Sequence, residues 1–301
     1  MTQTSPDAAR AAAPRTWLVT GSSRGLGLAL ATAALEAGDQ VVATARQPGQ
    51  LDDLVRTYGQ QVRTFALDVT DADAAQAAVG FAVAEFGRLD IVANNAGYAN
   101  SAPIEEMPGD DFRAQIEANL FGVVNVTRAA LPVLRRQRSG VFLQFSSVGG
   151  RVGGTPGMGA YQTAKFAVEG FSEVLASETR PFGIKVIIVE PGAFRTDWQG
   201  SSMRRYPVGP DYEATVGQMN AYRAAHDGTQ PGDPARAAQV ILRVLAEDEP
   251  PRRLLLGADA VTSALAAEAN RTAETQKWAA LSRATDFPAR ELAGQESASG
   301  G

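Results

Sequence analysis

Several residue types that build functional sites are scarce or absent in this sequence of 301 residues. It has no cysteine, which excludes disulfide bonds and metal sites with thiolate ligands. Its one histidine, His226, cannot form a site of several histidines, and any Ser-His-Asp triad would have to use it. We therefore expect no bound metal ion.

Long apolar runs and an excess of positive charge are also missing. No stretch approaches the roughly 18 consecutive apolar residues of a membrane-spanning helix. The N-terminal Met1–Arg15 lacks the apolar core of a secretory signal. The net charge of −5 gives no global basic surface for nucleic acid. Together these absences predict a cytoplasmic protein that binds neither membranes nor nucleic acids.

What is present suits one sizeable domain. With 45% hydrophobic and 20% charged residues, a chain of this length is ordinary for a single α/β domain. We expect that domain at 15–286, between flexible tails at 1–14 and 287–301. Short apolar runs alternate with helix-like runs, which is typical of a doubly wound parallel sheet. About seven strands are expected, at Thr16–Thr20, Gln40–Ala45, Val62–Leu67, Leu89–Ala93, Val141–Phe145, Lys185–Val189 and Arg253–Leu256.

A glycine-rich turn follows the first expected strand and precedes the helix-like run Leu26–Glu36. Its spacing is T-G-x-x-x-G-x-G. Glycines there allow a tight turn and close backbone approach, and helix N-terminal N–H groups attract a pyrophosphate. The turn therefore predicts a dinucleotide site formed by Gly21, Ser23, Arg24, Gly25, Leu26 and Gly27.

The end of the second expected strand bears on the choice of dinucleotide. An acidic residue near this point holds a ribose 2′-OH in dinucleotide folds, whereas an arginine accommodates a 2′-phosphate. Arg46 stands there, and no Asp or Glu lies between Asp39 and Asp52. This predicts NADP(H) rather than NAD(H); the alternative is a solvated arginine that meets no ligand.

Ser146–Lys165 reads as a strand end, a glycine-rich loop and the start of a helix. Tyr161 and Lys165 are four residues apart, so both side chains lie on one helix face. A phenol with a pKa near ~10 is a poor base at neutral pH, but a nearby ammonium group lowers that pKa. A serine hydroxyl at the strand end can hold a reacting oxygen beside the phenol. The pattern favours acid/base chemistry on an oxygen, although Y-x-x-x-K alone also occurs on ordinary surfaces.

Taken together, these segments resemble the short-chain dehydrogenase/reductase family from about Arg15 to Ala258. Further segments carry the resemblance: the N-N-A-G run at Asn94–Gly97, Asn119 within A-N-L-F-G, and Pro191, Gly192 and Thr196 in P-G-x-x-x-T. It implies one Rossmann-type domain that transfers a hydride between NADP(H) and a carbonyl/alcohol pair. It also implies cofactor contacts by Asp68, Val69, Asn95, Ala96, Gly97, Tyr161, Lys165, Pro191, Gly192 and Thr196.

The resemblance also assigns the catalytic roles. Tyr161 is the expected general acid/base, and Lys165 lowers its pKa and holds the nicotinamide ribose. Asn119 is expected to bind a water that connects the lysine to solvent. Ser147 is expected to bind the substrate oxygen because the residues after it match those after the family's serine. The spacing from Ser147 to Tyr161 is one residue longer than usual, which leaves Ser146 as an alternative.

The remaining expectations concern the substrate and assembly. The segment 195–231 mixes aromatic and methionine residues with Gly and Ser, as expected of a lid over an apolar small-molecule substrate. Asp111–Arg136 is expected as one helix kinked by Pro132. This helix and Gly159–Glu178 commonly pair across a two-fold axis in the family, which predicts a homodimer or homotetramer. Two other functions stay open: a catalytically silent NADP-binding regulator, and a sugar-nucleotide epimerase or dehydratase.

Overall fold

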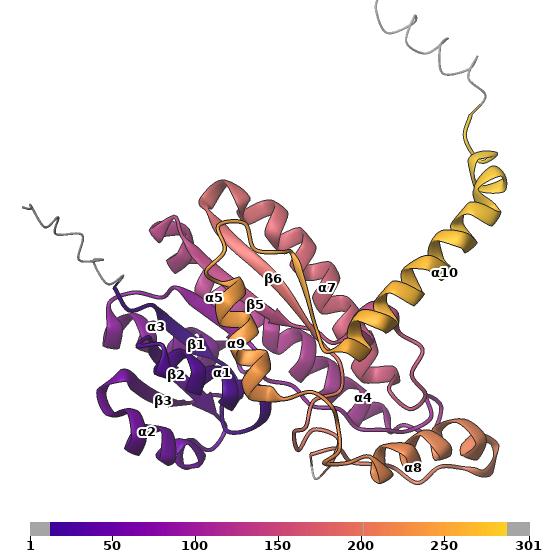
Figure 1. Ribbon diagram of the computed structural model, residues 1–301, viewed down its shortest axis with the longest axis horizontal. Helices are drawn as coiled ribbons and strands as arrows, with labels where there is room; N and C mark the ends of the chain where they lie inside the picture. The colour runs from indigo at the N-terminus through magenta and orange to yellow at the C-terminus, as the bar shows by residue number, and fades with distance from the viewer. Residues whose placement is uncertain (1–12, 201, 288–301) are drawn as a thin grey trace, which may run out of the picture.

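The computed structural model describes residues 13–200 and 202–287, and the expected tails fall almost entirely outside these ranges. Its strands lie within one or two residues of the expected positions. They are β1 (Thr16–Val19), β2 (Gln40–Ala45), β3 (Val62–Ala66), β4 (Ile91–Asn94), β5 (Gly140–Phe145), β6 (Ile184–Pro191) and β7 (Arg253–Leu256). All pair in parallel, in the order β3-β2-β1-β4-β5-β6-β7, which confirms the predicted fold class (Figure 1).

Helices connect the strands and cover both faces of the sheet (Figure 1). One layer contains α1 (Gly25–Glu36), α2 (Asp52–Tyr58) and α9 (Pro234–Val244). The other contains α3 (Ala72–Phe86), α5 (Gly122–Gln137) and α7 (Gly159–Thr179). The remaining α-helices are α4 (Gly109–Ile116), α6 (Val148–Val152), α8 (Gln218–Ala225) and α10 (Ala258–Arg283), with short 3₁₀ turns at Pro48–Leu51, Gly59–Gln61, Arg180–Phe182 and Pro210–Tyr212.

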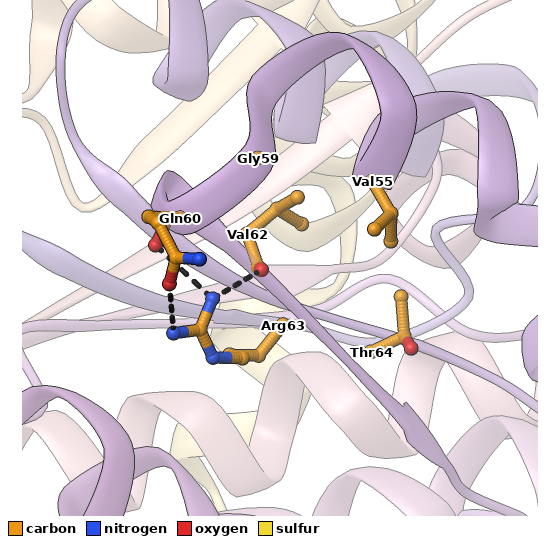
Figure 2. Close-up of a pocket in the computed structure, with 6 residues that line it drawn as sticks. All are labelled: Val55, Gly59, Gln60, Val62, Arg63 and Thr64. Carbon is orange, nitrogen blue, oxygen red and sulfur yellow. Dashed lines mark hydrogen bonds between the residues drawn. The ribbon is translucent and has the colours of Figure 1, made fainter.

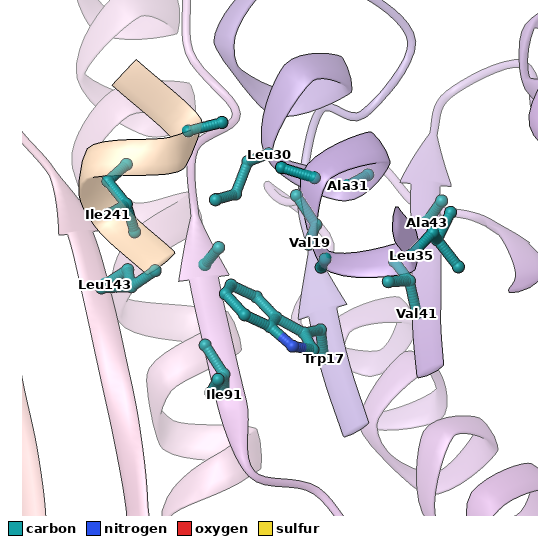
Figure 3. Close-up of a cluster of buried hydrophobic side chains, with 14 of the residues drawn as sticks. Trp17, Val19, Leu30, Ala31, Leu35, Val41, Ala43, Ile91, Leu143 and Ile241 are labelled. Carbon is teal, nitrogen blue, oxygen red and sulfur yellow. The ribbon is translucent and has the colours of Figure 1, made fainter. Parts of the chain in front are cut away.

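The two layers follow from the alternation of side chains along each strand. In β1, Trp17 and Val19 face α1, whereas Leu18 faces the layer that contains α3 and α5. All three are fully buried, and Figure 3 shows Trp17 and Val19 beside Leu30 of α1. A strand with no solvent face accounts for the continuous apolar run in the sequence.

The long helix expected at Asp111–Arg136 is interrupted, but not at the residue that the sequence suggested. Between α4 and α5 the chain forms a π-helical turn, Glu117–Phe121, and α5 then continues through Pro132 to Gln137. Asn119 lies inside this wide turn and is fully buried. The extra residue in the turn thus changes the direction of one polar side chain within an otherwise regular helix, as π-bulges at functional sites often do.

The sheet order creates one place where ligands commonly bind. β1 lies between β2 and β4, so the chain leaves the ends of β1 and β4 towards opposite sides of the sheet. In open α/β sheets a crevice forms at the carboxyl ends of such strands. The carboxyl ends of β1, β4, β5 and β6 carry the glycine turn, the N-N-A-G run, the two serines and Pro191 respectively.

The last helix departs from the rest of the fold. α10 starts beside β7 and extends away from the body of the domain (Figure 1). Within the described residues, no helix is long and apolar enough to cross a membrane.

The expected homodimer or homotetramer stays a prediction. Exposed apolar side chains on the outer surface provide a way to test it. Phe121 and Phe166 are 44% and 45% exposed, and Val174 on the same helix as Phe166 is 58% exposed. We expect these side chains to be buried between copies of the chain, so the protein should sediment as a dimer or tetramer at micromolar concentration. Phe166→Glu should shift it towards monomer, because a charge buried without a partner is costly. Leu281→Glu, on the far part of α10, is the control; a wild-type protein that sediments only as a monomer would refute the prediction.

Candidate active site

The ends of β1 and β4 are joined by hydrogen bonds between Thr20 and Asn95. The Thr20 hydroxyl accepts from the backbone N–H groups of Asn95 and Ala96, both at 3.0 Å, and donates to the Ala93 carbonyl. The Asn95 amide in turn donates to the carbonyls of Thr20 at 2.9 Å and Gly21 at 3.2 Å. We call these bonds the Thr20–Asn95 clasp. Asn95 was expected to contact a cofactor, but Thr20 was not singled out from the sequence.

The glycine turn lies directly against this clasp. Gly21 and Gly25 have positive φ angles of 67° and 59°, and a side chain on Gly27 would overlap the Gly21 carbonyl oxygen. The first turn of α1 has no side-chain cap and no acidic residue. Its N–H groups are therefore free to bind an anion, so the turn fits the pyrophosphate of a dinucleotide.

Residues from three strand ends meet beyond the glycine turn, where the adenosine was expected. Arg46 is exposed at the end of β2, and Arg24 is exposed in the turn. Asp68 accepts hydrogen bonds from the backbone and hydroxyl of Thr70, and these bonds, with a smaller contribution from Arg46, hold its pKa below the usual value. Asp71, rather than Asp68, caps α3. Asp68 therefore plays no part in capping α3.

Tyr161 and Lys165 extend from the first turns of α7 toward the end of β5. The Lys165 ammonium donates to the Phe145 carbonyl at 2.8 Å and lies 5.6 Å from the centre of the Tyr161 ring. Tyr161 is 8% exposed and Lys165 is 3% exposed. The pair shares one helix face, as the spacing of four residues predicts.

Their electrostatics differ from the expectation. Burial raises the pKa of Tyr161 to about 12, and hydrogen bonding with Ser147 opposes part of this shift. Burial lowers the pKa of Lys165 to about 8. In the free protein burial therefore dominates the Tyr161 pKa, and the Lys165 ammonium is directed at the Phe145 carbonyl oxygen rather than at the phenol. The phenol is thus fully protonated at neutral pH.

The two adjacent serines face different surroundings. Ser147 is partly exposed, interacts with Tyr161 and accepts a 3.1 Å hydrogen bond from the backbone of Gly149 at the start of α6. Ser146 is buried and donates to the Glu169 carboxylate at 2.8 Å. Only Ser147 is placed to meet a substrate beside the phenol.

Behind Ser146, a buried ion network fixes α7 to the sheet. Arg253 of β7 pairs with Glu169 of α7 at 2.5 Å and with Glu190 of β6 at 2.9 Å. Glu190 also pairs with Arg151 of α6 at 3.0 Å. Glu169 and Glu190 are 6% and 0% exposed, so each needs these partners. This network could not be predicted from the sequence, because its members are distant along the chain.

Asn119 carries an unpaired buried acceptor close to Lys165. Its amide nitrogen donates to the carbonyls of Tyr98 at 2.7 Å and Gln115 at 2.9 Å, while its Oδ1 atom has no partner. A side chain on Gly97 would overlap that oxygen and approach the Lys165 ammonium. An orphaned acceptor of this kind is a place for an ordered water between the two groups.

A segment from β6 to α9 covers the phenol from the other side. The rings of Tyr161 and Trp198 are 5.1 Å apart, and Met203 packs against both Tyr161 and Met158. Backbone hydrogen bonds join the segment to Ser101, which donates to Arg204 and accepts from Tyr206. Met203 was noted in the expected lid, but the contact of Trp198 with the phenol could not be read from the sequence.

The remaining predicted residues also surround this edge of the sheet. Thr196 lies against Gly25, since a side chain at that glycine would contact the Thr196 side chain at 3.4 Å. Pro191 is buried at the end of β6, and the Gly192 backbone donates to Leu256. Val69 approaches Gly122, and Ala96 approaches Gly21. The structure therefore brings together Gly21, Ser23, Arg24, Gly25, Leu26, Gly27, Arg46, Asp68, Val69, Asn95, Ala96, Gly97, Pro191, Gly192 and Thr196 at the carboxyl edge of the sheet.

Other surface features lie elsewhere. Figure 2 shows a hollow beside the edge strand β3, lined by Val55, Gly59, Gln60, Val62, Arg63 and Thr64, none of which is a predicted site residue. His226 is exposed and stacks on Tyr222 at 4.1 Å, so it does not complete a triad with either serine. In the described ranges no group of acidic or histidine residues could hold a metal ion.

The close approach at Gly27 gives a test of the turn with a matched control. Gly27→Ala should lower the free energy of unfolding by about 1–3 kcal/mol, because the new methyl group overlaps the Gly21 carbonyl. Gly80→Ala, within α3, has nothing within 4 Å and should raise it by about 0.5–1 kcal/mol. Urea denaturation measures both; equal effects of the two substitutions would show that Gly27 is not packed as described.

Known proteins share this arrangement. The model of the short chain dehydrogenase family matches residues 15–206. The oxidoreductase BOA17 of Botryotinia fuckeliana is 52% identical over 270 residues, which cover 89% of this chain and 98% of that protein. The 3-ketodihydrosphingosine reductase of Bacteroides thetaiotaomicron is 34% identical over 245 residues, with coverage of 81% and 88%.

Solved structures agree. A short-chain dehydrogenase from Streptomyces avermitilis matches with a TM-score of 0.84 at 40% identity, covering 91% of this chain and 99% of that one. Its similarity extends well beyond the residues of the family model. The chain belongs to the short-chain dehydrogenase/reductase family, whose members are oxidoreductases that bind a nicotinamide cofactor.

Proposed function

We propose that the protein is an NADP-dependent oxidoreductase that interconverts a ketone or aldehyde with an alcohol. The observation that carries this proposal is the buried Tyr161 phenol beside Ser147, on the edge of the sheet that carries the glycine turn. A protonated phenol in water-poor surroundings is suited to donate a proton to a carbonyl oxygen as negative charge develops there. When bound, the nicotinamide supplies or accepts the hydride.

Each nearby side chain has a distinct task in this reaction. In reduction, Ser147 donates a hydrogen bond to the carbonyl oxygen and Tyr161 transfers its proton to it. The resulting phenolate is stabilised by the Lys165 ammonium, because opposite charges attract more strongly in a buried site than in water. The unpaired Oδ1 atom of Asn119 holds a water through which Lys165 can recover a proton. In oxidation the same groups act in the reverse order.

The expected lid has a corresponding role in this proposal. Trp198 and Met203 exclude water from the phenol, and they have to separate from it when a substrate enters. Backbone amides of 195–231 should therefore exchange with deuterium more slowly when cofactor and substrate are both bound. Exchange that is equally slow in the free protein would count against a lid.

Removal of the phenol hydroxyl tests the mechanism. Tyr161→Phe should lower kcat by about 10²-fold or more, as expected for the loss of a positioned general acid, while the fold and cofactor affinity are retained. Turnover is measured by absorbance of the reduced nicotinamide over a panel of ketones. Turnover close to that of the wild type would rule out this role, whereas cofactor binding without turnover in the wild type would favour the silent regulator.

The two serines supply a matched pair for the same assay. Ser147→Ala should impair turnover severely, because it removes the hydroxyl beside the phenol. Ser146→Ala should mainly lower stability, by about 1–3 kcal/mol, since it leaves the buried Glu169 carboxylate short of a donor. The reverse outcome would assign the substrate contact to Ser146.

Arg46 and Arg24 favour NADP over NAD as the cofactor. A 2′-phosphate carries close to two negative charges, and a planar guanidinium can meet it with two hydrogen bonds. Each charge-assisted bond is worth about 1.5–3 kcal/mol, so one bond is enough for a preference of roughly tenfold. Asp68 lies close enough to Arg46 for their charges to interact, but its carboxylate is occupied by Thr70.

Kinetics with both cofactors test this choice. The ratio of kcat/KM for NADPH over NADH should exceed about ten in the wild type and fall by a similar factor in Arg46→Ala. Arg56→Ala is the control, because that arginine is exposed on α2 and pairs only with Asp53 among the described residues. A wild-type preference for NADH, or an unchanged ratio in Arg46→Ala, would show that Arg46 does not recognise the phosphate.

A further inference from the structure

The expected lid contains a buried positive charge that has no carboxylate partner among the described residues. Arg223 of α8 is 5% exposed, although arginine is rarely buried to this extent without an ion pair. Its guanidinium donates to three neutral oxygens: Ser101 Oγ at 3.2 Å, Asn220 Oδ1 at 3.1 Å and the Pro156 carbonyl at 3.0 Å. A guanidinium has five N–H donors, so two remain for another acceptor.

A second arginine lies close to the first. Arg205 forms a bridge with Ser101 through its backbone, and its Nη2 atom donates to the Gln199 carbonyl. Its Nε atom is buried and has no hydrogen-bond partner. Within the described residues, the ion pairs of the chain include neither Arg205 nor Arg223.

Two neighbouring positive charges at a buried position are unfavourable unless a negative charge balances them. Burial lowers the pKa of Arg223 to about 10, and repulsion by Arg205 adds to the shift. Apart from solvation by neutral oxygens, nothing in the described structure offsets two like charges held together. The ion network behind Ser146 shows the contrast, because its buried charges are matched by partners of opposite sign.

The two arginines adjoin the apolar cluster that contains Tyr161. Arg223 contacts Ser101 and Pro156, and the cluster includes Ala99 and Met158, each two residues away along the chain. Two residues of extended chain span at most roughly 7 Å. An anion bound by the guanidinium groups would therefore be separated from the phenol by a short apolar spacer, beside Met158 and Met203.

We propose that Arg223 and Arg205 recognise an oxyanion, a carboxylate or phosphate, on the carbonyl substrate. This inference rests on the proposed function and narrows its substrate class from apolar ketones to ketones with an anionic group. The remaining N–H donors of Arg223 and the unpaired Nε of Arg205 then acquire a charged acceptor. The apolar residues around Tyr161 contact the chain between the anion and the reacting carbonyl.

The test compares oxocarboxylates of about four to ten carbons, which cover a range of chain lengths, with their methyl esters and with phosphate monoesters of hydroxyketones. In the wild type, kcat/KM should be at least tenfold higher for one of the anionic series than for the esters, mainly through a lower KM. Arg223→Gln and Arg205→Gln should each remove most of that preference while ester turnover is retained. The series that is preferred distinguishes a carboxylate from a phosphate.

Arg204→Gln is the matched control, because Arg204 lies in the same segment but is exposed and stacks on Tyr206 at 4.3 Å. It should leave the preference for anions unchanged. Equal turnover of acids and esters in the wild type would overturn the inference and leave the proposed function standing. An equal loss of acid and ester turnover in Arg223→Gln would also overturn it, since that pattern means that Arg223 only holds the lid together.

Calorimetry separates the two proposals where turnover cannot. The same oxocarboxylates, ketone phosphates and esters are titrated into the wild type and Arg223→Gln with NADP present. Anion binding at least tenfold tighter than ester binding, lost in Arg223→Gln, would support the inference even if no ketone were reduced. No preference for anions in either assay would reject it.

Discussion

The Thr20–Asn95 clasp is the constraint on which the rest of the site depends. β1 and β4 are neighbours whose chains leave on opposite sides of the sheet, so no loop joins their ends. The five hydrogen bonds of the clasp hold the gap at a fixed width while leaving the backbone of Gly21 and Ala96 near the surface. The glycine turn can lie tightly against this edge because Gly27 has no side chain. A crevice for a dinucleotide is thus built from main-chain groups that cannot move independently.

Burial has opposite effects on the two halves of the site. At the glycine turn, exposed arginines and free N–H groups suit a highly charged ligand that remains partly hydrated. Around Tyr161, loss of water keeps the phenol protonated and lowers the pKa of Lys165. A proton donor is most effective if it stays neutral until the reaction and becomes charged only as its proton leaves. The buried half of the site around Tyr161 therefore suits proton transfer. The buried network of Glu169, Glu190 and Arg253 supports this half by holding α7 against β6 and β7.

Much of the fold could be predicted because its signals are local. Strands with two buried faces appear as apolar runs, and each glycine turn or polar cluster follows the strand that positions it. The interruption at Glu117–Phe121 was missed because a π-helical turn has no distinctive composition. The kink was predicted at Pro132 instead, because proline has a known local effect on a helix. Burial raises the pKa of Tyr161, which its spacing from Lys165 did not predict. Spacing along a helix predicts that two groups are near each other, but not how much water surrounds them.

Contacts between distant segments account for what the sequence could not reveal. Trp198 meets Tyr161, and Arg223 meets Ser101 and Pro156, only because the chain after β6 folds back over the edge of the sheet. Nothing in the scaffold requires these particular side chains, since β1 to β7 are complete without them. The fold therefore positions the reacting groups, while the segment after β6 that covers them determines which substrates can fit. Under our proposal, an apolar surface at the phenol with positive charge farther out would select a molecule by the distance between its carbonyl and its anion, which the sheet alone could not do.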